Sequence, residues 1–192
     1  MNKPEKFVIM MVGKTHSGKT AFALKLIRKL PEFIHLEGDP IHVFILQNFP
    51  LIWIVEKNRD GRDLKNPLLK HRLLNEVFIT ALERGFSVIL SSTNLQRNVR
   101  EFLIQESHER QARVALVYLN IPNETLLERV RASTKPTYFL NQSRDFVELL
   151  KRQELLWFEE PWLDEADWYL EIRDEKDIEP TIEKLVALVK SP

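Results

Sequence analysis

The sequence contains no cysteine, and its charges cancel. Without cysteine the chain can form no disulfide, no thiolate metal site and no cysteine nucleophile. Lys and Arg together number 28, as do Asp and Glu, so a net charge of zero provides no general attraction to nucleic acid or to an anionic membrane, although a local basic patch remains possible. No apolar run approaches the roughly 20 residues that a membrane helix needs. The first residues, MNKPEKF, do not resemble a signal peptide, so we expect a cytoplasmic protein.

Apolar runs alternate with amphipathic segments along the 192 residues. Strands are expected at 7–12, 33–38, 86–91, 113–121 and 167–172. Helices are expected at 19–30, from near Ile41 to a break at Pro50, and at 67–85, about 97–110, 122–133, 143–160 and 177–190. This alternation predicts an α/β fold in which helices cover both faces of a parallel sheet. The chain shows no internal repeat and no linker, so we expect a single domain over residues 1–192.

The segment 67–85 has the clearest helical period. Pro67 begins it and Gly85 ends it, as helix termini prefer. The apolar residues expected on one face are Leu69, Leu73, Val77, Phe78, Ala81 and Leu82.

Residues 13–20, GKTHSGKT, match the phosphate-binding pattern G-x-x-x-x-G-K-[ST] between a predicted strand and a predicted helix. Gly13 and Gly18 allow the backbone to turn its N–H groups toward a phosphate, and the helix N-terminus adds partial positive charge. Lys19 is expected to reach the β- and γ-phosphates, and Thr20 to offer its hydroxyl to Mg²⁺. The motif therefore predicts ATP with Mg²⁺, the alternative being a glycine-rich turn without a ligand. The complete predicted nucleotide loop is Gly13, Lys14, Thr15, His16, Ser17, Gly18, Lys19, Thr20 and Ala21, with residues 14–17 contributing mostly backbone groups.

Asp39, in HLEGDP, is the first candidate for the chemistry beyond the phosphate loop. It follows the second predicted strand, and the carboxyl ends of parallel strands face the nucleotide crevice. Its carboxylate could accept the proton of an acceptor hydroxyl, or it could hold Mg²⁺. Glu37 is a weaker candidate, and a simple Gly-Asp-Pro turn is the structural alternative.

The sequence SSTN, at 91–94, ends the third predicted strand without the carboxylate that a nucleotide hydrolase places there. This argues against efficient hydrolysis but leaves metal binding through Thr20 and Asp39 open.

Arg129 and Arg131, at the end of a predicted helix, could stabilise charge on a transferring phosphoryl group, although only one of them can face the site. Arg97 and Arg100 are lesser candidates for gripping an acceptor phosphate.

In this order, the segments VGKTHSGKT, EGDP, GFSVILSSTN…R, VALVYLNIPNETLLERVRA and EEPWLDEADWYLEI resemble the P-loop kinase family of polynucleotide 5′-hydroxyl kinases and related small-molecule kinases. Zeta-toxin-like and chloramphenicol-phosphotransferase-like enzymes are neighbours of that family. The resemblance excludes about 45–66. It implies a P-loop NTPase fold with an adenylate-kinase-like, five-stranded parallel sheet, and transfer of phosphoryl from ATP and Mg²⁺ to a hydroxyl.

The resemblance also implies residue roles. Asp39 would be the base, and Arg129 or Arg131, in a small lid near 129–144, would contact the phosphates of ATP. The family pattern D-x-T-N normally places Asp where this chain has Ser91. Independently of the resemblance, we expect an insert near 40–66 on the substrate side to contact the acceptor.

Three functions are compatible with these features. The first is an ATP-dependent kinase that phosphorylates a hydroxyl of a small molecule. The second is a kinase acting on a polynucleotide end, which the charged segment 57–65 favours and the zero net charge disfavours. The third is an ATP-binding switch with little turnover, which the absence of the strand-end Asp favours.

Overall fold

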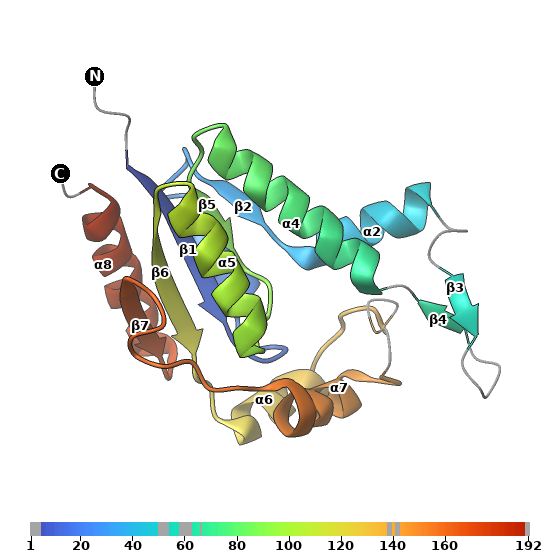
Figure 1. The fold of residues 1–192 in the computed structure, drawn as a ribbon. Helices are drawn as coiled ribbons and strands as arrows, with labels where there is room; N and C mark the ends of the chain where they lie inside the picture. Colours follow the sequence, from blue (N-terminus) through green and yellow to red (C-terminus); the bar gives the residue numbers. More distant parts are fainter. Residues whose placement is uncertain are drawn as a thin grey trace.

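The central sheet has five parallel strands, as the sequence predicts. The computed structural model describes residues 5–49, 54–57, 63–65, 67–137, 140 and 143–190. In spatial order the strands are β2 (Ile34–Leu36), β5 (Val88–Leu90), β1 (Lys6–Val12), β6 (Ala112–Leu119) and β7 (Trp168–Ile172). Each neighbouring pair is parallel. A separate antiparallel pair, β3 (Ile54–Lys57) and β4 (Asp63–Lys65), lies away from this sheet, near one end of α2 and α4 (Figure 1).

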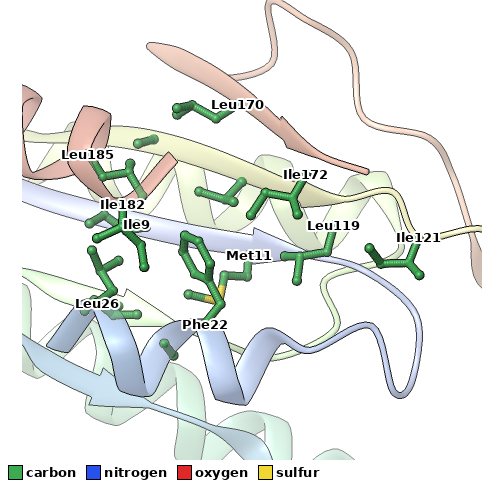
Figure 2. Close-up of a cluster of buried hydrophobic side chains, with 14 of the residues drawn as sticks. Ile9, Met11, Phe22, Leu26, Leu119, Ile121, Leu170, Ile172, Ile182 and Leu185 are labelled. Atoms are coloured by element: carbon green, nitrogen blue, oxygen red, sulfur yellow. The ribbon is translucent and has the colours of Figure 1, made fainter. Parts of the chain in front are cut away.

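Helices cover both faces of the sheet. Alternate side chains of β1 enter two separate cores, so the strand is apolar throughout after Lys6. Phe7, Ile9 and Met11 pack toward α1 (Lys19–Ile27) and α8 (Ile178–Lys190), in the core shown in Figure 2. Val8, Met10 and Val12 belong to the core of the opposite face, with α4 (Pro67–Glu83) and α5 (Arg97–Glu109). Within the described residues, no helix combines the length and the apolar composition needed to cross a bilayer.

The apolar face of α4 is rotated relative to the predicted one. Val77 is 45% exposed, whereas Leu74, which the pattern omitted, is only 5% exposed. The buried positions Leu74, Phe78, Ala81 and Leu82 follow the i, i+4, i+7, i+8 spacing of one helical face. Val77 precedes Phe78 by one residue and therefore points about 100° away from it.

The remaining helices lie around the carboxyl ends of the strands. α2 (Gly38–Asn48) begins three residues before the predicted start, because Asp39 and Pro40 both suit a first helical turn. α6 (Asn123–Arg131) and α7 (Phe146–Arg152) lie beyond the ends of β1 and β6 (Figure 1).

The predicted helix 143–160 is shorter than expected and changes its winding. After α7 it continues as the π-helical turn η2 (Gln153–Trp157), in which Phe158 N donates to Gln153 O at 2.8 Å. The 3₁₀ turn η3 (Glu175–Asp177) follows β7. Residues 50–53, 58–62 and 66, which belong to the predicted insert near 40–66, lie outside the described residues.

Candidate active site

The phosphate loop, residues 13–20, connects β1 to α1 and depends on both of its glycines. Gly18 has φ of 98° and caps the N-terminus of α1, a left-handed conformation that favours glycine. At Gly13 the limit is space, because a Cβ atom there would lie 2.7 Å from Ser17 Oγ and 3.2 Å from Leu119 O. These contacts explain why glycine occupies the first and sixth positions of the motif.

Lys19 is buried inside its own loop. Its ammonium donates to Lys14 O at 2.8 Å and to Ser17 Oγ at 3.2 Å. Burial, and then the positive charge of Lys135, lower the pKa of Lys19 to about 8, while the carboxylates of Asp39 and Glu37 act in the opposite direction. The charges of Lys135, Asp39 and Glu37 therefore all act on the Lys19 ammonium.

Glu37 and Thr20 meet at the edge of the sheet. Glu37 follows β2 and is the N-cap residue of α2. Thr20 Oγ1 donates to Glu37 Oε1 at 2.5 Å. Hydroxyl and carboxylate oxygens are the hard ligands that Mg²⁺ prefers, so the Thr20–Glu37 pair fits this ion. Glu37 is therefore a stronger candidate ligand than the sequence indicated. The described residues contain no cluster of three His, Asp or Glu side chains, and Mg²⁺ sites of kinases normally use only one or two carboxylates with phosphate and water.

Asp39 lies in the first turn of α2, rather than in a loop after the strand. Its carboxylate forms an ion pair with Lys135, from the segment that follows α6. The Asp39 side chain is 34% exposed, so solvent or a ligand can still reach it. The ion pair joins the segment predicted as a lid to the first turn of α2.

Of the two lid arginines, only Arg129 is directed at the phosphate loop. Its Nη1 donates to His16 O at 3.3 Å. Arg131 is exposed at the end of α6 and is not brought into the site. Two residues span about 200° of an α-helix, so the two side chains leave opposite sides of α6, and it is Arg129 that points toward the loop.

Ser91 and Asn94 serve structural roles at the end of β5. Ser91 is 2% exposed, and its Oγ lies 2.7 Å from His35 Nε2. Asn94 adopts a left-handed φ of 47° and its amide donates to Met11 O at 2.8 Å, which ties the ends of β5 and β1 together. Glu37, on the neighbouring strand end, supplies the carboxylate near Thr20 that this strand lacks.

Arg100 is a structural residue, so its prediction as an acceptor-phosphate contact is wrong. Its side chain is fully buried and bonds Glu165 with two nitrogens, at 2.7 and 2.8 Å. Nη1 also donates to the carbonyls of Asn94, Leu95 and Glu159. The guanidinium therefore fastens the 159–165 segment to the start of α5.

Two residues of η2 contact the phosphate loop, and the sequence patterns missed both. The side chain of Gln153, 4% exposed, accepts a 2.6 Å hydrogen bond from Thr15 N through Oε1. Glu154 forms an ion pair with Lys14, which also donates to Asn123 Oδ1 at 2.7 Å. A Gln-Glu pair inside an amphipathic helix carries no motif, and both residues lie at the start of the π-helical turn.

His16 links the phosphate loop to the segment near 129–144 that the sequence predicts as a lid. Its φ of 59° is unusual for a residue other than glycine. Its Nε2 lies 2.8 Å from Ser133 Oγ, and its ring packs edge-on against Phe146, with centroids 4.9 Å apart. Burial lowers the pKa of His16, and Lys135, Lys19 and Arg129 lower it further.

A cavity of about 320 Å³ opens beside the phosphate loop. One wall is Gly18, Ala21 and Lys25, where the loop becomes α1. The opposite walls are Arg129 and the segment after β7, whose lining residues are Asp174, Glu175 and Ile178. The volume is within the range of small-molecule sites.

The sequence of this chain matches a known protein family and a curated relative. The AAA domain family (AAA_33) matches residues 8–155. A probable gluconokinase of Schizosaccharomyces pombe (strain 972 / ATCC 24843) is 30% identical over 170 residues, which cover 86% of this chain and 79% of that protein.

Two solved structures share the fold. The Mycobacterium tuberculosis APS kinase in complex with AMPPNP and APS has a TM-score of 0.61 at 16% identity, covering 98% of this chain and 99% of that chain. A sugar kinase from Janibacter sp. HTCC2649 has a TM-score of 0.59 at 22% identity, covering 98% and 100%.

Proposed function

We propose that this chain, which belongs to the AAA domain family (AAA_33) and is a P-loop kinase, transfers the γ-phosphoryl group of ATP to a hydroxyl of a small polar molecule. One observation carries the proposal: Lys19, the Thr20–Glu37 pair and the Asp39–Lys135 pair meet at the carboxyl edge of the sheet. Phosphoryl transfer requires mainly positioning and charge stabilisation, and this arrangement can provide both.

ATP would bind with its phosphates along residues 13–20 and its nucleoside in the 320 Å³ cavity. The backbone N–H groups of the loop and the N-terminus of α1 favour a polyphosphate. Lys19 would exchange its contacts with Lys14 O and Ser17 Oγ for the β- and γ-phosphates. Arg129, which lines the cavity and reaches the loop, would neutralise phosphate charge from the lid side.

Thr20, Glu37 and Asp39 would hold Mg²⁺, Thr20 through its hydroxyl and the two acids directly or through water. When bound, the ion neutralises charge on the phosphate oxygens. Glu37 lies near Thr20, whereas Asp39 lies one residue beyond Gly38 on the acceptor side. This separation allows Asp39 to face the attacking hydroxyl.

Asp39 would orient the acceptor hydroxyl and accept its proton. The hydroxyl oxygen forms a bond to the γ-phosphorus as the bond from phosphorus to the bridging oxygen of ADP breaks. The proton passes to the Asp39 carboxylate, and ADP leaves with the electron pair. Lys135, ion-paired with Asp39, would hold the lid segment over the site.

A transfer assay tests the proposal. The protein is incubated with Mg²⁺ and γ-labelled ATP together with sugar acids, polyols, sugars, nucleosides and 5′-hydroxyl oligonucleotides. The relative from Schizosaccharomyces pombe makes gluconate the first sugar acid to offer. Label on a small molecule supports the proposal. Label on oligonucleotides alone would replace the small molecule by a polynucleotide end.

The alternative function is an ATP-binding switch with little turnover. The observation in its favour is the end of β5, where Ser91 pairs with His35 and no carboxylate is present between residues 91 and 94. Tight ATP binding without label on any acceptor would support it. Our preference is for the kinase, because Glu37 supplies a carboxylate next to Thr20 from the adjacent strand.

A further inference from the structure

We propose that Lys70 and Ser92 form a subsite for an anionic group of the acceptor, a carboxylate or a phosphate. The inference rests on the proposed function, because it assigns a substrate class to the same site. It concerns neither the phosphate loop nor the ATP cavity. The subsite lies on the acceptor side, where α4 and the end of β5 approach the start of α2.

Lys70 reaches the site from the first turns of α4. Its Cδ and Cε atoms each lie 3.7 Å from the position that a Cβ on Gly38 would occupy. The aliphatic part of the side chain therefore passes over Gly38, and the carboxylate of Asp39, the next residue, is close enough to raise the pKa of the Lys70 ammonium. Because residue 38 is glycine, no Cβ atom fills the space between Lys70 of α4 and Ser92 after β5.

Ser92 approaches the same point from the carboxyl end of the neighbouring strand β5. Its Oγ lies 3.6 Å from the Cβ position of Gly38. That oxygen is buried and makes no hydrogen bond within the described part of the chain. A buried hydroxyl without a partner loses its hydration without compensation, so Ser92 has a donor to offer to a ligand.

Among the described residues, the ammonium of Lys70 also has no counterion of its own. Burial lowers the pKa of Lys70, Asp39 raises it and Lys135 lowers it. Asp39 already forms an ion pair with Lys135, and Lys70 makes no hydrogen bond or ion pair to any other residue that the structure describes. Two cations therefore share one carboxylate, and the excess positive charge is half-buried.

An anionic oxygen would satisfy both groups at once, by accepting from the ammonium and from the hydroxyl. Because Asp39 adjoins the subsite, the reacting hydroxyl and the anionic group would belong to the same small acceptor. A neutral polyol would leave Lys70 without its counterion. The subsite therefore selects hydroxylated acids or sugar phosphates over neutral polyols.

The test compares matched ligands that differ in charge. Binding of gluconate and glucitol, and of glycerol 3-phosphate and glycerol, is measured by calorimetry in the presence of a non-hydrolysable ATP analogue and Mg²⁺. The proteins are the wild type, Lys70→Met, Lys70→Arg and Ser92→Ala. Arg72→Met, an exposed cation on the same helix, is the matched control. Melting temperatures show that every variant is folded.

We expect at least one anion to bind more tightly than its neutral counterpart. Lys70→Met should lower the protein's affinity for that anion by about 10- to 100-fold, the loss expected for a hydrogen bond to a charged group. Its affinity for the ATP analogue should stay unchanged. Lys70→Arg should retain most of the affinity, Ser92→Ala should lose several-fold, and Arg72→Met should behave as wild type. The pair that responds distinguishes carboxylate from phosphate.

The proposal is overturned if neutral and anionic members bind alike, or if Lys70→Met leaves the preference for the anion unchanged. Transfer to a neutral acceptor alone would overturn it while leaving the kinase function intact. Conversely, Lys70-dependent anion binding without phosphoryl transfer would support the subsite and contradict the proposed kinase function.

Discussion

At the scale of single residues, the ion pair between Asp39 and Lys135 is the contact that transfer would depend on most. Asp39→Asn removes the proton acceptor and should lower turnover by about 10²- to 10⁴-fold, the usual contribution of a general base. ATP affinity should change little, because the phosphate loop is untouched and Asn retains a side-chain oxygen for Mg²⁺ or its water. Single-turnover rates and nucleotide affinity, measured on the same preparation, check this prediction.

Lys135→Met is the control for that experiment. It breaks the same ion pair but leaves the Asp39 carboxylate in place, so its loss of turnover should be smaller than that of Asp39→Asn. Equal losses in the two variants would mean that the pair only holds the lid, and Asp39 would then no longer be assigned as the base.

At the scale of elements, η2 sets the conformation of the phosphate loop through Gln153. π-Helical turns are rare and often mark functional sites, and here the turn directs a buried amide to Thr15 N. Gln153→Met should leave that N–H unpaired and lower the free energy of unfolding by about 1–3 kcal/mol. If a phosphate oxygen of ATP accepts from Thr15 N, the difference should shrink when ATP is bound. Urea denaturation with and without ATP measures both values.

Gln105→Met is the matched control, since Gln105 lies exposed on α5 and bonds only Glu109 among the described residues. It should have little effect on stability under either condition. If Gln153→Met proved no more destabilising than Gln105→Met, the contact with Thr15 would not stabilise the loop.

At the scale of the whole molecule, the free energy of unfolding should depend on pH through His16, in the phosphate loop, and His35, in β2. Burial is the largest effect on both, and it lowers the pKa of each imidazole. Unfolded histidine titrates near pH 6.5, so below that pH the unfolded chain binds protons that the folded chain resists. The free energy of unfolding of the nucleotide-free protein should therefore fall between pH 7.5 and 5.5.

Urea denaturation across that range provides the measurement. The double variant His16→Gln, His35→Gln should have a flatter profile than the wild type, because it removes two groups that titrate differently in the two states. A wild-type profile that stays level, or that rises toward acid pH, would contradict the assignment of buried neutral imidazoles.

The sequence by itself determined the α/β class and the phosphate loop, because both depend on local patterns. Apolar runs buried on both faces predict parallel strands, and GKTHSGKT constrains backbone conformation over eight consecutive residues. Five such runs predict the five parallel strands that the structure confirms, and the resemblance to P-loop kinases added the P-loop NTPase fold.

Only the tertiary structure decided which distant side chains meet. No local period encodes contacts between separate elements of the chain. The contacts in question are Glu37 with Thr20, Gln153 with Thr15 and Lys135 with Asp39. The choice of Arg129 over Arg131 depends on how α6 is rotated against the loop. Arg100 was misjudged because its charge suggests a ligand site, whereas packing against Glu165 buries it completely.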